Sequence, residues 1–189
     1  MRNIDSGRTS QAEVARGLIA PAGKPPRPGY RLRDFALQSS DGREISVSDY
    51  RGRSNLVLLF VGRVSTETTG WLQRCNTQYS SLREEAAQVL AVLHASETIA
   101  KAQKDTLRLS FPILADTDGD MHREYGAVDA TNSPVPALYV ADNFGEVVLA
   151  SSDPDLLIIS NFYEIVKTLQ FMNSQCPECE APEWPLEEF

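Results

Sequence analysis

The sequence predicts a single α/β domain, with a central mixed sheet and helices on both of its faces. Residues 56–61 and 89–93 are continuous apolar runs rich in β-branched residues, as expected of strands buried on both faces. A helical pattern lies between them, and two strands joined through a helix form a right-handed parallel unit. The chain of 189 residues, 42% of them hydrophobic, is long enough to bury one such core.

The first half of the chain supplies a hairpin, two strands and two helices. Residues 34–38 and 44–47 flank an Asp-Gly turn at 41–42 and predict a short hairpin before the first buried strand. Residues 99–107 predict a second helix after the strand at 89–93. Between the strands, apolar residues spaced three and four apart predict one stripe on one helix: Leu72, Cys75, Tyr79, Leu82 and Ala86.

The second half completes the sheet with another hairpin. Residues 120–125 predict a short helix ended by Gly126, and residues 137–141 and 146–149 predict antiparallel strands around a turn. The final helix is predicted from one apolar stripe and a cap at Ser160 or Asn161: Phe162, Ile165, Val166 and Leu169.

Composition narrows the possible functions. With 18 basic and 26 acidic residues, a net charge of −8 and a pI near 4.8, the chain is not expected to bind nucleic acid. No apolar run approaches the roughly 18 residues that cross a bilayer, and no N-terminal apolar signal is present, so no membrane partner is expected. Three cysteines do not make a secreted disulfide framework, which favours a reducing, cytoplasmic location.

The predicted organisation has three parts. Residues 1–28 form a mildly basic, proline-rich N-terminal arm, and residues 29–173 form the domain. Residues 174–189 form an acidic C-terminal tail with five glutamates, no basic residue and a Cys-x-x-Cys motif.

Three segments of the chain together resemble the conserved parts of one known family. Residues 28–52, with Asp34-Phe35-Ala36-Leu37, resemble the family's opening. Residues 111–126, with Phe111-Pro112-Ile113-Leu114, are similar to its central segment, and residues 135–145 to its last hairpin. In this order and spacing, the segments resemble the peroxiredoxins, in the alkyl hydroperoxide reductase/thiol-specific antioxidant (redoxin) family. The resemblance covers roughly residues 28–170, and it implies a thioredoxin-like fold and an antioxidant oxidoreductase.

The chain departs from this family at the active loop. Peroxiredoxins carry Pro-x-x-x-Thr-x-x-Cys after the first buried strand, and Gly62, Thr66 and Thr69 occupy the three named positions here. Residues 61–74 contain no cysteine, and residues 127–144 contain no basic residue to match the family's arginine. Because a thiolate is the nucleophile in peroxide reduction and a hydroxyl does not replace it, no peroxidatic chemistry is expected at this loop.

The three cysteines differ in how well they suit redox chemistry. Cys75 lies on the apolar helix stripe and is expected to be a buried core residue. Cys176 and Cys179 form the one sharp motif and are the candidate catalytic pair, since this spacing suits a disulfide or two corners of a metal site. The pair follows a helix and has glutamates beside it, so both thiol pKa values are expected to be high and nucleophilic attack slow.

Other candidate sites are weaker. His94 and His122 have no ligand spacing, and each is expected to be an ordinary hydrogen-bonded histidine. A metal site would therefore need four sulfur ligands from two tails, so no metal and no cofactor are expected. Asp116, Asp118 and Asp120 are expected to cap the following helix rather than bind calcium.

Two loop features have open interpretations. Pro136 stands where thioredoxin-like folds usually place a cis-proline, and the resemblance implies that it shapes a groove for an extended thiol substrate. The alternative is a rigid hairpin turn. Thr66 and Thr69, together with Thr68, mark either an anion-binding helix start or a solvated turn.

Two functions follow. The first is a peroxiredoxin-like thiol redox protein that uses the Cys176–Cys179 dithiol for thiol–disulfide exchange or thiol-dependent peroxide reduction. Its expected partners are a thiol or disulfide substrate protein or a small-molecule thiol, with a homodimer possible. The alternative is a non-catalytic scaffold whose tail pair is a structural disulfide or binds zinc.

Overall fold

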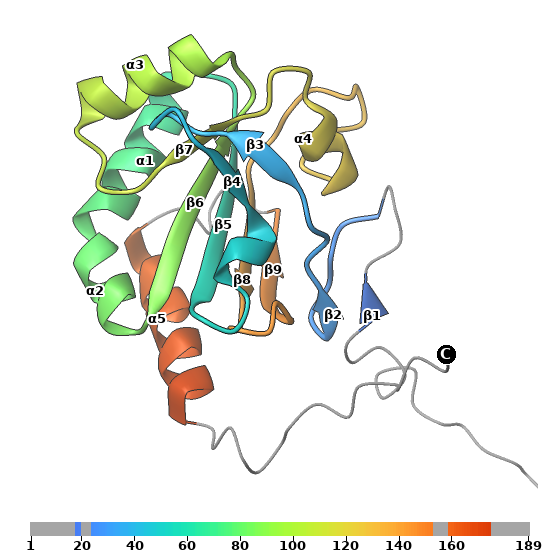
Figure 1. The fold of residues 1–189 in the computed structure, drawn as a ribbon, viewed down its shortest axis with the longest axis vertical. Coiled ribbons are helices and arrows are strands. Elements are labelled where there is room, and N and C mark those ends of the chain that lie inside the picture. Colours follow the sequence, from blue (N-terminus) through green and yellow to red (C-terminus); the bar gives the residue numbers. More distant parts are fainter. Residues whose placement is uncertain (1–17, 20–23, 153–158, 175–189) are drawn as a thin grey trace, which may run out of the picture.

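The computed structural model describes residues 18–19, 24–152 and 159–174, and Figure 1 shows their arrangement. The five-stranded sheet has the order β7-β6-β5-β8-β9. Strands β5 (Asn55–Gly62), β6 (Ala87–Leu93) and β7 (Ile113–Ala115) run parallel. Strands β8 (Ala137–Ala141) and β9 (Val147–Ser151) are antiparallel neighbours on the other side of β5. The expected mixed sheet and thioredoxin-like α/β class are confirmed.

Strand β5 lies at the centre, and all eight of its residues are buried. Its side chains alternate between two clusters: Val57, Leu59 and Val61 belong to one and Leu56, Leu58 and Phe60 to the other. This alternation follows from the two-residue period of a strand. Both faces of the sheet are therefore covered, as the continuous apolar run predicts.

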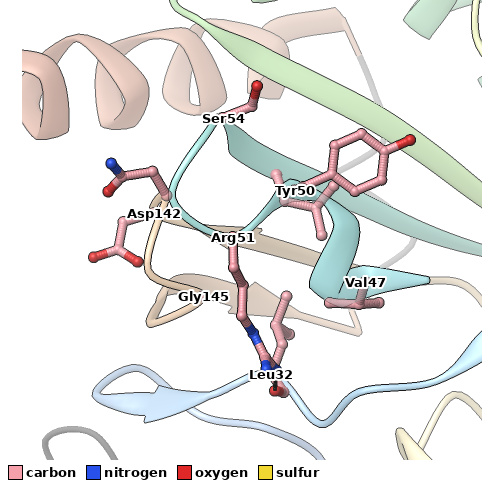
Figure 2. A pocket seen from close by; sticks show the side chains of 9 residues that line it. Leu32, Val47, Tyr50, Arg51, Ser54, Asp142 and Gly145 are labelled. Carbon is pink, nitrogen blue, oxygen red and sulfur yellow. Dashed lines mark hydrogen bonds between the residues drawn. The ribbon is translucent and has the colours of Figure 1, made fainter.

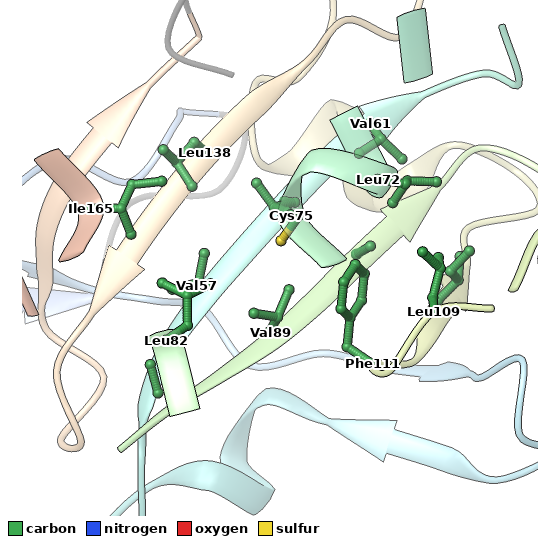
Figure 3. Packing of buried hydrophobic residues seen from close by; sticks show 14 of the residues in the cluster. Val57, Val61, Leu72, Cys75, Leu82, Val89, Leu109, Phe111, Leu138 and Ile165 are labelled. Carbon is green, nitrogen blue, oxygen red and sulfur yellow. The ribbon is translucent and has the colours of Figure 1, made fainter. Parts of the chain in front are cut away.

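Four helices pack on the first face: α1 (Thr66–Thr77), α2 (Tyr79–Glu84), α3 (Glu97–Leu107) and α5 (Ile159–Ser174). Figure 3 shows side chains of α1, α2 and α5 meeting those of β5, β6 and β8 in this cluster. The helices bury the predicted stripes, so that Leu72 and Leu82 are fully inaccessible, as are Ile165 and Leu169.

The second face is covered by a hairpin and a short helix. Strands β3 (Ala36–Gln38) and β4 (Glu44–Ser46) pair antiparallel as expected, and the 3-10 helix η1 (Val47–Tyr50) follows. Helix α4 (Asp120–Glu124) ends before Gly126, which has φ +68°. Tyr125 is buried here, with its ring 5.0 Å from Phe60, and its hydroxyl donates to the carbonyl of Arg33.

The structure corrects four details. The predicted single helix divides at Gln78, whose amide donates back to Arg74 and Cys75. Ala86 is exposed rather than on the stripe, because the chain there takes φ +54° to turn into β6. Strand β7 was not predicted, since only three residues pair in it. Helix α5 begins at Ile159, so neither Ser160 nor Asn161 is its N-cap.

The N-terminal arm contributes one described pair of residues to a sheet. Strand β1 (Leu18–Ile19) pairs in parallel with β2 (Tyr30–Arg31). Residues 175–189, which hold the predicted acidic tail and its Cys-x-x-Cys motif, lie outside the described residues.

Arg108 tests the backbone strain at the end of α3. It is exposed and takes φ 50°, ψ 48°, the left-handed conformation that disfavours residues with a Cβ. We expect Arg108→Gly to raise the free energy of unfolding by about 0.5 kcal/mol, measured by chemical denaturation. Arg108→Ala removes the same charge but keeps the Cβ, and it should give no such gain; equal effects of the two substitutions would contradict the strain.

Candidate functional site

The carboxyl ends of the parallel strands meet at one edge of the sheet. Gly62 ends β5, His94 directly follows β6, and Asp116 directly follows β7. The His94 amide donates to the Gly62 carbonyl at 2.8 Å, which ties two of these ends together. Ligands of α/β sheets bind preferentially at this kind of edge.

Ser65 starts helix α1 at this edge. Its side chain accepts a hydrogen bond from the Thr68 amide at 3.0 Å, which makes it the N-cap. The Thr68 hydroxyl is buried and lies 2.6 Å from the Arg63 carbonyl and 3.0 Å from the Val61 carbonyl. Thr68 therefore closes the loop by hydrogen bonding to its backbone and is not presented to a ligand.

Thr66 and Thr69 lie in the first turn of α1. Thr66 is exposed and Thr69 half-buried, and the Thr69 amide donates to the Ser65 carbonyl at 3.0 Å. A helix start stabilises a thiolate, but it does not ionise a threonine hydroxyl near neutral pH. The position to which the resemblance assigns the peroxidatic sulfur thus has the favourable field without the nucleophile.

Gly62, at the family's proline position, has a backbone that proline does not adopt. Its φ is +71°, whereas a proline ring holds φ near −65°. A Cβ at Gly62 would also lie 3.2 Å from the Pro134 carbonyl oxygen. Glycine is required here by both the dihedral angle and the close approach.

Pro136 lies beside this loop, because Ala137 pairs with Phe60 and Pro134 touches Gly62. All peptide bonds of the described residues are trans, so the cis-proline implied by the resemblance is wrong. The Val135 amide donates a hydrogen bond to the Ala127 carbonyl as the chain enters β8. The substrate groove at Pro136 stays a prediction.

Cys75 is confirmed as a core residue. Its sulfur points into the cluster on the first face (Figure 3), and the residue is fully buried. Burial strongly raises the pKa of its thiol. Because a buried, protonated thiol is a poor nucleophile, Cys75 supplies no redox chemistry to the folded domain.

A buried carboxylate–imidazole pair lies at the same edge. The His122 Nδ1 is 2.6 Å from the Asp116 Oδ2, and the His122 amide donates to the same oxygen at 2.9 Å. The Met121 amide donates to the other carboxylate oxygen, so Asp116 caps this turn as predicted. His122 is the hydrogen-bonded histidine that was expected.

The structure differs from the prediction for the second histidine, His94. His94 was expected to be hydrogen-bonded, but its Nδ1 is buried without a partner among the described residues. Its ring lies 5.8 Å from that of His122. Both His94 and Asp116 directly follow buried strands, and this is the sequence signal that could have placed them at one edge.

The electrostatics of the pair favour an ionised carboxylate. Burial alone raises the pKa of Asp116, but hydrogen bonds from the His122 ring and from backbone amides outweigh burial and hold the pKa below its ordinary value. Burial, together with the charges of His122 and Arg63, lowers the pKa of His94.

Two depressions lie on the surface of the described domain. The first encloses about 10 Å³, room for about one water, and Figure 2 shows Tyr50, Arg51 and Asp142 around it. The second is an open, acidic depression of about 320 Å³ beside Asp116, with Glu44 and Asp118 in its lining. Neither is lined by Thr66, Thr69 or Pro136.

The described residues hold no group of three or more histidine, cysteine or acidic side chains that suits a metal ion. No helix among them is long and apolar enough to cross a membrane. The candidate catalytic residues Cys176 and Cys179 lie outside the described residues.

The place where the chain leaves the domain is nevertheless described. Helix α5 ends at Ser174, and Asn173 donates to the Glu85 carbonyl at 3.0 Å and accepts from Asn55 at 2.9 Å. Asn55 begins β5, and Glu85 lies just before β6. The end of α5 is therefore at the opposite edge of the sheet from Thr66 and Thr69, as Figure 1 also shows.

Comparisons with known proteins give one family match and several relatives. The model of the AhpC/TSA family matches residues 28–150. Peroxiredoxin Q from Gentiana triflora is 23% identical over 177 residues, covering 83% of this chain and 78% of that protein. Thiol-disulfide oxidoreductase ResA from Geobacillus thermodenitrificans is 28% identical over 141 residues, covering 74% and 70%.

Solved structures show the same fold. Peroxidoxin BcpB from Mycobacterium tuberculosis superimposes with a TM-score of 0.72 at 16% identity, over 79% of this chain and 99% of that one. AhpC from Enterococcus faecalis gives a TM-score of 0.66 at 21% identity, over 78% and 96%.

The burial of Cys75 can be tested by thiol labelling. In the Cys176→Ser, Cys179→Ser double variant, we expect no reaction with a chromogenic disulfide reagent until denaturant unfolds the domain, and then one thiol per chain. Rapid labelling of the native double variant would show that Cys75 is accessible.

The Asp116 network predicts a pH-dependent stability. Since the folded pKa lies below the unfolded value of about 4, the carboxylate stabilises the fold above that pH and loses this contribution as the pH falls through the folded value. We expect Asp116→Asn to lower the free energy of unfolding by about 2 kcal/mol at pH 7 and by less below pH 4, measured by denaturant titration. Exposed Asp118→Asn is the control, and a deficit for Asp116→Asn that does not shrink in acid would contradict this account.

Proposed function

The chain belongs to the AhpC/TSA family, and from this premise we propose that it is a thiol redox protein whose chemistry resides on Cys176 and Cys179. The supporting observation is the state of Cys75, which is fully buried with a raised thiol pKa. The chain has three cysteines, so sulfur chemistry in this protein falls to the tail pair.

The length of chain after Ser174 limits how near Cys176 comes to the loop at residues 61–74 of the same chain. Strand β5 has eight residues, so its two ends are about 23 Å apart. Cys176 is two residues beyond Ser174, a connection that spans about 7 Å at most. Because Ser174 lies at the opposite edge, Cys176 does not take the place of the missing sulfur near Thr69 in the same chain.

The proposed reaction is thiol–disulfide exchange, with peroxide reduction by the same dithiol as a second possibility. One thiolate attacks a sulfur of a disulfide and forms a mixed disulfide as the first substrate thiol leaves. The second tail thiolate then attacks the mixed disulfide, releases the second thiol and closes Cys176–Cys179. With a hydroperoxide, the dithiol gives the same disulfide, an alcohol and water.

A reductant must reopen the bridge for turnover. A small-molecule thiol or a thiol protein in a reducing compartment, the cytoplasm, supplies these electrons. The thiol-disulfide oxidoreductase name of one relative and the peroxiredoxin name of others support both reactions as chemistry of this family. A homodimer stays a prediction.

The electrostatics favour slow exchange over fast peroxide reduction. The carboxyl end of a helix and neighbouring carboxylates both disfavour a thiolate. Helix α5 has no basic residue in its last turn, and Glu178 lies between the two cysteines. The pair therefore suits a redox-responsive dithiol better than a rapid peroxidase.

The second candidate function is a non-catalytic scaffold. The observation that favours it is the family loop itself, where Thr68 is bonded to the backbone and Gly62 has replaced proline. In this case, the tail pair would be a structural disulfide or would bind zinc between two chains, with one zinc per two chains.

An assay of the tail dithiol separates these functions. With dithiothreitol as reductant, we expect the protein to reduce bis(2-hydroxyethyl) disulfide at least tenfold faster than the Cys176→Ser, Cys179→Ser double variant does, because the variant has no dithiol. Hydrogen peroxide consumption is measured in parallel.

Cys75→Ala is the matched control, since it also removes a thiol but should keep the full rate. Equal background rates for the wild type and the double variant would overturn the enzymatic function. Zinc analysis and alkylation of the unreduced protein would then identify the form of the scaffold.

A further inference from the structure

The imidazole of His94 lies against residues 116–126, the segment that carries α4, and we propose that this contact is a pH-sensitive switch. With His94 neutral, the segment is closed on the sheet. Protonation of His94 in mild acid opens it. The inference concerns the carboxyl edge of the sheet, so it goes beyond the proposed function and does not depend on the tail cysteines.

The segment packs directly on the His94 ring. Gly119, which precedes α4, takes φ +72°, and a Cβ there would lie 3.1 Å from the His94 Nε2. The centre of the His122 ring is 5.8 Å from that of His94. The backbone of His94 is held at the same time, because its amide donates to the Gly62 carbonyl at 2.8 Å. A change at the His94 ring therefore acts on the segment through Gly119 and His122.

A protonated His94 has no acceptor in the closed arrangement. An imidazolium donates from both ring nitrogens, but the His94 Nδ1 is buried without a hydrogen-bond partner among the described residues. The His122 Nε2 is in the same state, so the two rings do not bond to each other. The Asp116 carboxylate already accepts from the ring and the amide of His122 and from the amide of Met121. A buried N–H without an acceptor destabilises the state that contains it.

The charges around His94 also oppose its protonation. They come from the loop after β5, from the residue after β7 and from α4, and they are Arg63, Asp116, His122 and Arg123. Burial is the main cause that lowers the pKa of His94, the charges of His122, Arg63 and Arg123 act in the same direction, and Asp116 acts against them. Arg123 is itself paired with Asp120, and this pairing does not reverse its effect on His94.

This lowering fixes the direction of the switch. A His94 ring released from the segment titrates near its ordinary pKa of about 6.5. The open state therefore takes up the proton more readily than the closed state, and the closed state loses stability as the pH falls from about 6.5 to the folded pKa. Asp116 stays ionised over this range, because its pKa is held below its ordinary value of about 4.

Opening of the segment reaches the N-terminal arm. Glu124 pairs with Arg33, whose guanidinium also donates to the Lys24 carbonyl at 2.9 Å. Gly126 lies against Pro25, since a Cβ at Gly126 would be 3.0 Å from the Pro25 ring. The segment thus connects the carboxyl edge of the sheet to the end of the arm, and acid would loosen this connection.

Hydrogen exchange of single amides measures the opening. The Arg123 and Tyr125 amides donate to the Gly119 and Met121 carbonyls within the segment. In the full chain, we expect their protection to fall at least about threefold between about pH 7.5 and about pH 5, after correction for the intrinsic exchange rate. The amides of residues 57–60 in the central strand should show no such fall.

Three variants locate the titrating group. His94→Gln keeps a polar side chain that does not titrate, so its protection at about pH 5 should equal that at about pH 7.5. Arg63→Gln removes an exposed cation near His94, so it should raise the midpoint of the His94 titration, followed by NMR, and reduce the fall in protection. Arg83→Gln removes an exposed cation from the last turn of α2 and is the matched control, with no change in either quantity.

Several results would overturn the switch. One is a fall in protection that persists in His94→Gln, and another is a His94 midpoint at or above about 6.5 in the unsubstituted protein, because the two rings would then share the proton. Titration of His94 without any fall in protection would show that the ring turns into solvent while the segment stays closed. If His94→Gln does not fold, equal behaviour of Arg63→Gln and Arg83→Gln decides against the proposal. The proposed dithiol function is unaffected by each of these results.

Discussion

The burial of strand β5 on both faces is the constraint on which the rest of the structure depends. Its eight residues are buried, and they divide between the two hydrophobic clusters. A strand with no exposed residue must be covered by helices on one side and by the hairpin and α4 on the other. Its two ends then define the two edges of the sheet: Gly62, His94 and Asp116 lie at one edge, and the end of α5 lies at the other.

At the carboxyl edge, three residues hold the backbone in place. Thr68 binds the loop carbonyls, Gly62 packs on Pro134, and Asp116 holds the turn before His122. The hydrogen bonds of Thr68 and Asp116 satisfy backbone polar groups that burial would otherwise leave unpaired, whereas the contact of Gly62 with Pro134 is a close backbone approach. The loop at residues 61–74 contains no cysteine.

At the amino edge, Asn173 fastens the end of α5 to the starts of β5 and β6. This anchor places the end of α5 at the opposite end of the central strand from Thr66 and Thr69. The described part of the chain therefore leaves the domain about one strand length from the loop at residues 61–74, which contains no cysteine.

The sequence by itself determined the sheet strands 56–61 and 89–93 and both hairpins, because burial on both faces leaves a continuous apolar run and a glycine turn leaves a local signature. It also determined the core role of Cys75, from the apolar helix stripe, and the family, from the three segments that resemble it. Only the tertiary structure decided the break at Gln78, the short strand β7 and the meeting of His94 with Asp116 and His122. It also decided that α5 ends opposite the loop. These features depend on contacts between segments distant in the chain, which local periodicity does not encode.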